Sequence, residues 1–130
     1  MRSQMKSPIS RVTIIVCSCN RERLLAETIN SITGLRKPRQ AHIEVIVVDN
    51  ASTDNTPLII NNLASPFPIQ YVREERLGHS IALNRGVRES KGELLLFTDD
   101  DALVDVDWLF EYWRYANAHR EAGYFFSKII

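Results

Sequence analysis

The chain has 130 residues, and its 16 basic and 16 acidic side chains leave a formal net charge of zero. This length supports one compact domain with one hydrophobic core. The balanced charge gives no reason to expect nucleic acid or an anionic membrane as the main partner. No apolar run approaches the roughly 18 residues that a membrane-spanning helix needs, so we expect a soluble chain, with peripheral membrane association as an open alternative.

Strand and helix patterns alternate along the sequence, which predicts an α/β fold with a mostly parallel sheet and flanking helices. The β-branched run 12–17 predicts a central strand buried on both faces. A helix with apolar residues at helical spacing follows, and we expect Asn20 to cap its start and Gly34 to end it. Residues 43–49 repeat the buried-strand pattern and lead through a polar turn into a short helix.

The second half of the chain continues the alternation. Residues 69–72 predict a short strand near a sheet edge. A helix is expected over 78–91, with small residues that allow close packing on the sheet and with Gly92 after its end. Residues 93–98 predict the fourth strand, and Asp105 or Asp107 is expected to begin a last helix whose aromatic residues pack into the core.

The two cysteines indicate the compartment. Cys17 and Cys19 lie two residues apart in a predicted strand, where their side chains share a face but stand too far apart for a comfortable disulfide. A reducing cytoplasm is therefore the expected location. We expect Cys17 to be a buried and unreactive thiol.

Polar side chains gather where the predicted strands end. They are Ser18, Cys19, Asn20 and Arg21 after the first strand, Asp49, Asn50 and Ser52 after the second, and Asp99, Asp100 and Asp101 after the fourth. Ligands of open parallel sheets bind outside the carboxyl ends of the strands, so we expect these residues on one rim. Mg²⁺ and Mn²⁺ take carboxylate and phosphate oxygens, so three consecutive carboxylates predict half of a metal site. A solvated turn that caps the next helix is the competing interpretation.

Four segments carry a resemblance to a known family. "VTIIVCSCNR", "IEVIVVDNASTDNT", "GHSIALNRGVRESKGELLLFTDDDA" and "DVDWL" are similar, in order and spacing, to the N-terminal half of the family 2 inverting glycosyltransferases of the GT-A fold. The resemblance covers about residues 12–123. It implies a tail over 1–10, a nucleotide-sugar-binding domain with a Rossmann-like sheet over 11–130, and absence of the family's C-terminal acceptor half.

The resemblance also implies cofactors and site residues. The expected donor is a UDP-sugar, with GDP and dTDP sugars as alternatives, bound with Mn²⁺ or Mg²⁺. Ser18 and Asp49 fall where family members contact the base, Asp99 where they face the ribose, and Asp101 or Asp100 where they bind the metal. The candidate donor-binding residues are Ser18, Asn20, Asp49, Asn50, Ser52, Arg76, Asn84 and Asp99, and the candidate metal ligands are Asp99, Asp100 and Asp101.

Two departures from the family pattern affect the expected donor contacts. Cys19 stands where the family often has an aromatic residue, and Leu83 where it often has an arginine. The family's general base lies in the C-terminal half, so no catalytic residue is assigned on this chain.

The resemblance predicts transfer of a sugar, with inversion, to an unknown glycan, lipid or other hydroxyl acceptor. The alternative is a truncated nucleotide-sugar-binding remnant without transfer activity. A phosphotransfer or nucleotidyltransfer domain is disfavoured, because "SCNR" supplies neither an acidic pair nor a Gly-rich loop after the first strand. An uncovered sheet edge and the apolar C-terminal residues predict self-association into a homo-oligomer.

Overall fold

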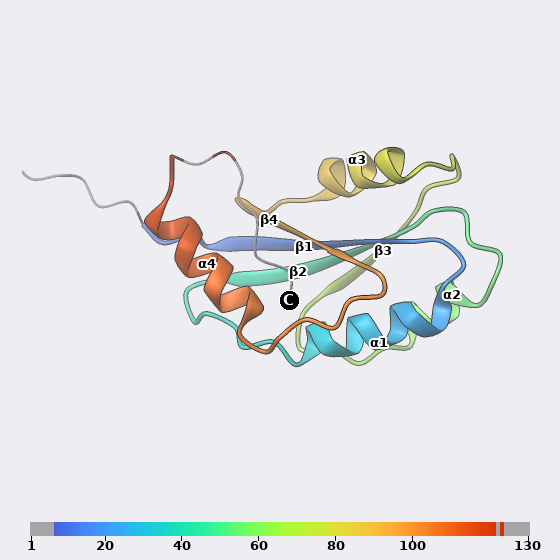
Figure 1. Cartoon of the computed structure of the whole chain (residues 1–130), viewed down its shortest axis with the longest axis horizontal. Coiled ribbons are helices and arrows are strands. Elements are labelled where there is room, and N and C mark those ends of the chain that lie inside the picture. The colour runs from blue at the N-terminus through green and yellow to red at the C-terminus, as the bar shows by residue number, and fades with distance from the viewer. Residues whose placement is uncertain (1–6, 122, 124–130) are drawn as a thin grey trace, which may run out of the picture.

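The computed structural model describes residues 7–121 and residue 123. Strands and helices alternate through these residues, as the sequence predicts (Figure 1). The elements are β1 (Arg11–Ser18), α1 (Glu22–Thr33), β2 (His42–Asp49), α2 (Thr56–Asn61), β3 (Ile69–Arg73), α3 (His79–Glu89), β4 (Leu94–Asp99) and α4 (Trp108–Ala118). The α/β fold class is confirmed.

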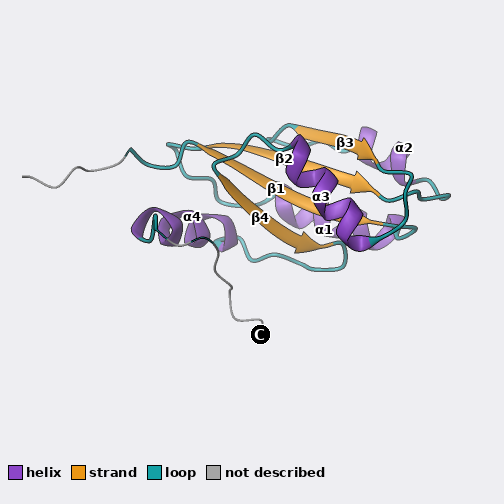
Figure 2. Cartoon of the chain, turned by 90° about the horizontal axis from the view of Figure 1, so that it is seen from above, coloured by secondary structure: helices purple, strands orange, loops and turns teal. Residues whose placement is uncertain are grey.

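The described strands form one sheet in the order β3-β2-β1-β4, and each neighbouring pair is parallel. All the strand arrows point the same way in Figure 2. The short strand β3 lies at one edge of the sheet, as predicted. The register pairs Cys17 with Asp99 and Ser18 with Asp49, so the carboxyl ends of β1, β2 and β4 meet at one edge.

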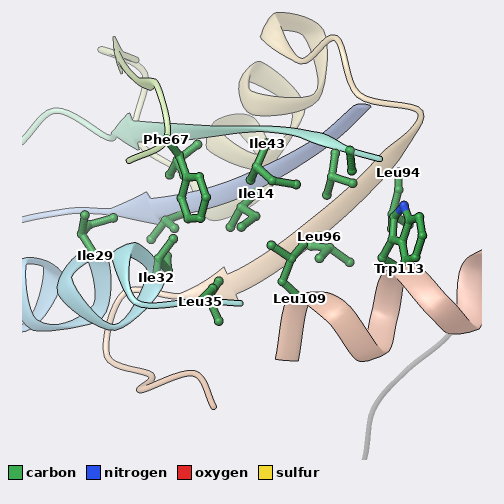
Figure 3. Close-up of a cluster of buried hydrophobic side chains, with 14 of the residues drawn as sticks. Ile14, Ile29, Ile32, Leu35, Ile43, Phe67, Leu94, Leu96, Leu109 and Trp113 are labelled. Carbon is green, nitrogen blue, oxygen red and sulfur yellow. The ribbon is translucent and has the colours of Figure 1, made fainter. Parts of the chain in front are cut away.

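Helices cover both faces of the sheet. α3 lies alone on one face, while α1, α2 and α4 lie on the other (Figure 1). Successive residues of a strand point to opposite faces. Ile14 and Val16 therefore belong to the core cluster beneath α1 and α4, which Figure 3 shows. Ile15 and Cys17 belong to the cluster beneath α3. Each fully buried aliphatic side chain stabilises the fold by about 1.5–3 kcal/mol, which explains the continuous apolar run of the central strand.

Small residues bring α3 close to the sheet. A Cβ atom on Gly86 would lie 2.6 Å from Cγ2 of Ile15, so only glycine allows the helix axis its present distance from β1. Ala82 is also buried against the sheet, whereas Ser80 is exposed. The predicted small-residue face is confirmed at two of its three positions.

The structure corrects two of the predicted helix ends. Arg21, and not Asn20, is the N-cap residue of α1. Asn20 instead adopts a left-handed backbone conformation, with φ of 53°, and turns the chain between β1 and α1. The C-cap residue of α3 is Ser90, in an extended conformation, so Gly92 does not cap the helix. The Gly92 N–H donates to Oγ1 of Thr13, and a Cβ atom there would lie 2.6 Å from the Thr13 nitrogen, so glycine is needed for close approach to β1.

The segment before β1 packs onto α4. Ile9 is buried, its N–H donates to Oδ1 of Asn117, and its carbonyl accepts from Nε1 of Trp113 at 2.8 Å. Residues of the expected tail therefore join the folded unit from Ile9 onward. The apolar C-terminal residues expected to drive self-association all fall within 124–130, outside the described part of the chain. No helix within the described ranges has the length and apolarity to cross a membrane.

Candidate functional site: an acidic pocket at the carboxyl ends of the strands

A pocket of about 440 Å³ opens at the carboxyl ends of β1 and β4. Its walls come from the end of β1 and the turn after it, from the loop after β2, from the start of α3, and from the end of β4. The lining residues are Cys17, Ser18, Cys19, Arg21, Asn50, Leu77, His79, Ala82, Asp99, Asp100 and Asp101. The predicted rim thus exists, and it contains part of the predicted set.

The three consecutive carboxylates of the acidic triplet, Asp99, Asp100 and Asp101, have different surroundings. Asp100 is buried, and its Oδ2 atom accepts a hydrogen bond of 2.8 Å from the Ser18 hydroxyl. Its main-chain carbonyl accepts another, also of 2.8 Å, from Oγ1 of Thr28 on α1. Asp99 and Asp101 are exposed. The middle residue is therefore anchored to the scaffold, and its two neighbours are accessible from the pocket.

Arg21 supplies positive charge among these carboxylates. Its Nη1 atom lies 3.3 Å from Oδ1 of Asp100 and 3.5 Å from Oδ2 of Asp101. Adjacent like charges repel unless an opposite charge lies between them, and the guanidinium meets that requirement. Arg21 is one of the polar residues predicted to lie on this rim, and it lines the pocket. The sequence alone does not assign it a donor-binding or metal-binding role, because its ion pairs with Asp100 and Asp101 are visible only in the fold.

The acidic triplet fits a hard divalent cation that brings further ligands. Within residues 7–121 and 123, no group of three or more His, Cys, Asp or Glu side chains is arranged to hold a metal ion by itself. Mg²⁺ commonly binds to one or two carboxylates and completes its shell with phosphate oxygens and water. The exposed carboxylates of Asp99 and Asp101 are oxygen ligands of this kind.

Asp49 lies outside the pocket lining, and its carboxylate is fully buried. Oδ1 accepts a hydrogen bond from the Ser52 N–H, and Oδ2 accepts one of 2.6 Å from the Tyr71 hydroxyl and one of 3.3 Å from Arg73. Burial, followed by the hydrogen bond to Asp49, raises the pKa of the Tyr71 phenol. Asp49 thus ties the loop after β2 to strand β3, and a contact of Asp49 with a base stays a prediction.

Asn20 and Ser52 also hold loops together and do not line the pocket. The Asn20 N–H donates to the Ser52 hydroxyl at 2.8 Å, and Oδ1 of Asn20 accepts from the Thr53 N–H at 2.7 Å. These bonds join the turn after β1 to the loop after β2. Such contacts fix the relative position of two strand ends that both border the site.

Asn50 lines the pocket and fixes one of its walls. Its Nδ2 atom donates to the carbonyls of Glu74 and Arg76, at 3.0 and 2.7 Å, and its Oδ1 atom accepts from the Gly78 N–H. These bonds clamp the segment that carries Leu77 into the wall.

Two further candidates lie outside the pocket lining. The Arg76 side chain is exposed and forms an ion pair of 3.2 Å with Glu74. Asn84 is exposed on α3, and Ala82 is the residue of that helix turn that reaches the pocket.

The Glu74 ion pairs predict a dependence of stability on pH. Hydrogen bonds from the Arg76 side chain and N–H, with Arg85 nearby, lower the pKa of Glu74 from 4.5 to about 2. Because the folded pKa lies below the unfolded one, this contribution is present above pH 4.5 and is lost as the pH falls from 4.5 towards 2. In urea unfolding, we expect Glu74→Gln to be less stable than the wild type at pH 7 and to lose less unfolding free energy than the wild type between pH 5 and pH 3. The control Glu111→Gln, which removes an exposed ion pair, should lose as much as the wild type over that range. An equal loss of unfolding free energy in the two variants would contradict this prediction.

The two cysteines are free thiols with different environments. Burial, and secondarily the negative charge of Asp100, raise the pKa of Cys17 to about 11. At pH 8 only about one Cys17 in a thousand is then a thiolate, the form that reacts with alkylating agents. We expect iodoacetamide to label the partly exposed Cys19 in the native protein and to label Cys17 only after denaturation, as read by peptide mass spectrometry. Equal labelling of both in the native state would refute this.

Fold and site together define an α/β ligand-binding domain of the open parallel-sheet class, with an acidic pocket at the carboxyl ends of its strands. The sequence model of the family "Glycosyl transferase family 2" matches residues 13–129. The chain belongs to this family, as the sequence motifs predict.

Relatives and solved structures agree with the family match. The succinoglycan biosynthesis protein ExoM of Rhizobium meliloti (strain 1021) is 36% identical over 107 residues, which are 81% of this chain and 34% of ExoM. The crystal structure of S. aureus TarS 1-349 in complex with UDP-GlcNAc superposes with a TM-score of 0.74 at 25% identity, over 85% of this chain and 32% of that one. The mannosyltransferase PcManGT from Pyrobaculum calidifontis, in complex with GDP-Man and Mn²⁺, gives a TM-score of 0.68 at 34% identity, over 82% and 33%.

These likenesses confirm the predicted fold class and family. The chain spans about a third of the length of ExoM, of the TarS 1-349 fragment and of PcManGT.

Proposed function

We propose that the pocket binds a nucleoside-diphosphate sugar together with Mn²⁺ or Mg²⁺, as the donor site of an inverting glycosyltransferase. The observation that carries the proposal is the acidic triplet at the edge where the carboxyl ends of β1 and β4 adjoin. The ligands of TarS and PcManGT, which are UDP-GlcNAc and GDP-Man with Mn²⁺, support a nucleotide sugar and a divalent cation. A UDP-sugar is the donor that we expect first.

The surroundings of the acidic triplet support a division of roles. Asp101 and Asp99, which are exposed, would hold the cation. Asp100 would act as a positioning residue, because Ser18 and Thr28 already bind it. The cation, when bound, would supply positive charge that stabilises the diphosphate leaving group. Asn50 would keep the facing wall of the pocket in place.

Transfer requires an acceptor hydroxyl that attacks the sugar from the opposite face, which inverts the anomeric centre. The acceptor would be a glycan, a lipid or another hydroxyl compound, and the name of the relative ExoM supports synthesis of a cell-envelope polysaccharide. The free thiols are consistent with a cytoplasmic location, at the inner face of the membrane if the acceptor is a lipid. Phe97 is 48% exposed on the edge strand β4, which supports association with a second copy.

The test is calorimetric titration of UDP-glucose, UDP-GlcNAc, GDP-mannose and UDP into the chain, with and without Mn²⁺. We expect Mn²⁺-dependent binding of at least one nucleotide sugar. We also expect slow hydrolysis of the bound donor by water, which releases free nucleotide and sugar. Metal-dependent binding without release or transfer would favour the alternative of a donor-binding chain without activity. Absence of binding under every condition would overturn the proposal.

A further inference from the structure

Arg21 has a fixed backbone and a side chain that can move. Its carbonyl accepts the hydrogen bond of 2.8 Å from the Leu25 N–H that begins α1, and Asn20 sets the turn before it. The Arg21 side chain is 50% exposed and lines the pocket. The guanidinium can therefore change partners without any change in the core.

Arg21 lies at the N-terminus of α1, where the helix dipole disfavours a positive charge. The N-terminus of a helix carries a partial positive charge, and a cation there is disfavoured by a few tenths of a kcal/mol to about 1 kcal/mol. Arg21 is the N-cap residue of α1, so its charge lies at the wrong end of the helix. The carboxylates of Asp100 and Asp101 supply the compensating attraction.

The two ion pairs of Arg21 differ in how readily they can break. Asp100 keeps its hydrogen bonds from Ser18 and Thr28 if the guanidinium leaves. Asp101 is half-exposed, and among the described residues its side chain pairs with Arg21, at 3.5 Å. A divalent cation against Asp101 would repel a guanidinium at the same carboxylate. The pair with Asp101 is therefore the one that a metal ion would replace.

We propose that Arg21 is an internal counter-ion that competes with the divalent cation for Asp101 and then turns to the anionic ligand. This inference rests on the proposed donor site. In the metal-free chain the guanidinium neutralises the acidic triplet. With a cation at Asp101, the guanidinium would be released but would remain in the pocket, where it would add positive charge beside the nucleoside diphosphate. Metal alone therefore binds weakly, and metal and nucleoside diphosphate bind cooperatively.

The test measures binding of Mn²⁺ alone, of UDP alone and of both together, by calorimetry on the wild-type chain and on Arg21→Gln. We expect Arg21→Gln to bind Mn²⁺ alone about 2- to 5-fold more tightly, the range of an exposed ion pair. The factor by which Mn²⁺ strengthens UDP binding should fall by about 5-fold. Arg21→Lys, which keeps the charge, should stay nearer to the wild type in both quantities.

The matched control is Arg114→Gln. Arg114 forms an exposed ion pair with Glu111 on α4, outside the pocket, so its loss changes the net charge equally without touching the acidic triplet. Both quantities should then equal those of the wild type. Circular dichroism and thermal unfolding establish that each variant is folded.

The outcomes separate this inference from the proposed function. If the wild type binds UDP with Mn²⁺ and Arg21→Gln shows the same Mn²⁺ affinity and the same cooperativity, the counter-ion role is wrong and the donor site stands. If UDP never binds but Arg21→Gln still binds Mn²⁺ more tightly than the wild type, the competition stands and the donor site fails. If neither Mn²⁺ nor UDP binds to any variant, both are overturned.

Discussion

Asp101→Asn is expected to weaken Mn²⁺-dependent UDP binding by about 100-fold or more. Loss of a residue that only supports a metal ligand costs about 10- to 100-fold in metal affinity, and loss of a ligand itself should cost at least the upper value. The amide keeps the size of the side chain but removes the negative charge that the cation requires. Calorimetric titration of UDP at saturating Mn²⁺, compared with titration without metal, measures the effect. Binding of UDP without metal should not weaken, because the substitution removes a carboxylate that repels the diphosphate and frees Arg21.

The matched variant is Asp100→Asn, one residue away in the same acidic triplet. The Asp100 carboxylate accepts from Ser18 and pairs with Arg21 inside the protein, so its loss should lower stability more than metal affinity. Asparagine keeps one acceptor oxygen for the Ser18 hydroxyl, but its NH₂ group would face the Arg21 guanidinium as an unpaired donor. An unpaired buried donor costs about 1–3 kcal/mol, which urea unfolding resolves. If Asp100→Asn abolishes metal-dependent binding while Asp101→Asn retains it, the assignment of the metal ligand to Asp101 is wrong.

Gly92→Ala is expected to destabilise the fold by about 3 kcal/mol, at the upper end of the usual cost of overpacking. The new methyl group would lie 2.6 Å from the backbone nitrogen of Thr13 and 2.9 Å from the carbonyl oxygen of Leu94. Both atoms belong to paired strands, so neither can move without breaking the β1–β4 pairing. Urea unfolding followed by circular dichroism measures the loss.

Gly34→Ala provides the control for this substitution. A Cβ atom at Gly34 would lie 3.7 Å from the Ser31 carbonyl oxygen, which is an ordinary contact, so the change should stay within about 0.5 kcal/mol. Equal stability of the two variants would mean that the sheet can adjust at Gly92. A shift of β4 in Gly92→Ala should also weaken ligand binding at the acidic pocket, because the register of β4 on β1 places Asp99 beside Cys17.

Local patterns in the sequence determined the elements and their order. A buried strand and an amphipathic helix each show their periodicity within a few residues, so the runs 12–17 and 43–49 and the helix that Asp107 begins were recognisable without any partner. The same patterns placed the acidic triplet at the end of a strand. Because parallel strands end at a common edge, its location in a pocket followed from the fold class.

Tertiary structure decided which polar residues face the pocket and which hold the loops. The sequence places Asp49 at a strand end, but only the structure shows that Tyr71 and Arg73, from the neighbouring strand, donate to its carboxylate. The sequence places Arg21 on the same rim as the acidic triplet, but only the pairing of β1 with β4 shows that it contacts carboxylates about 80 residues away in the chain. Burial and charge at a site depend on partners remote in sequence, and only the packed sheet brings those partners together.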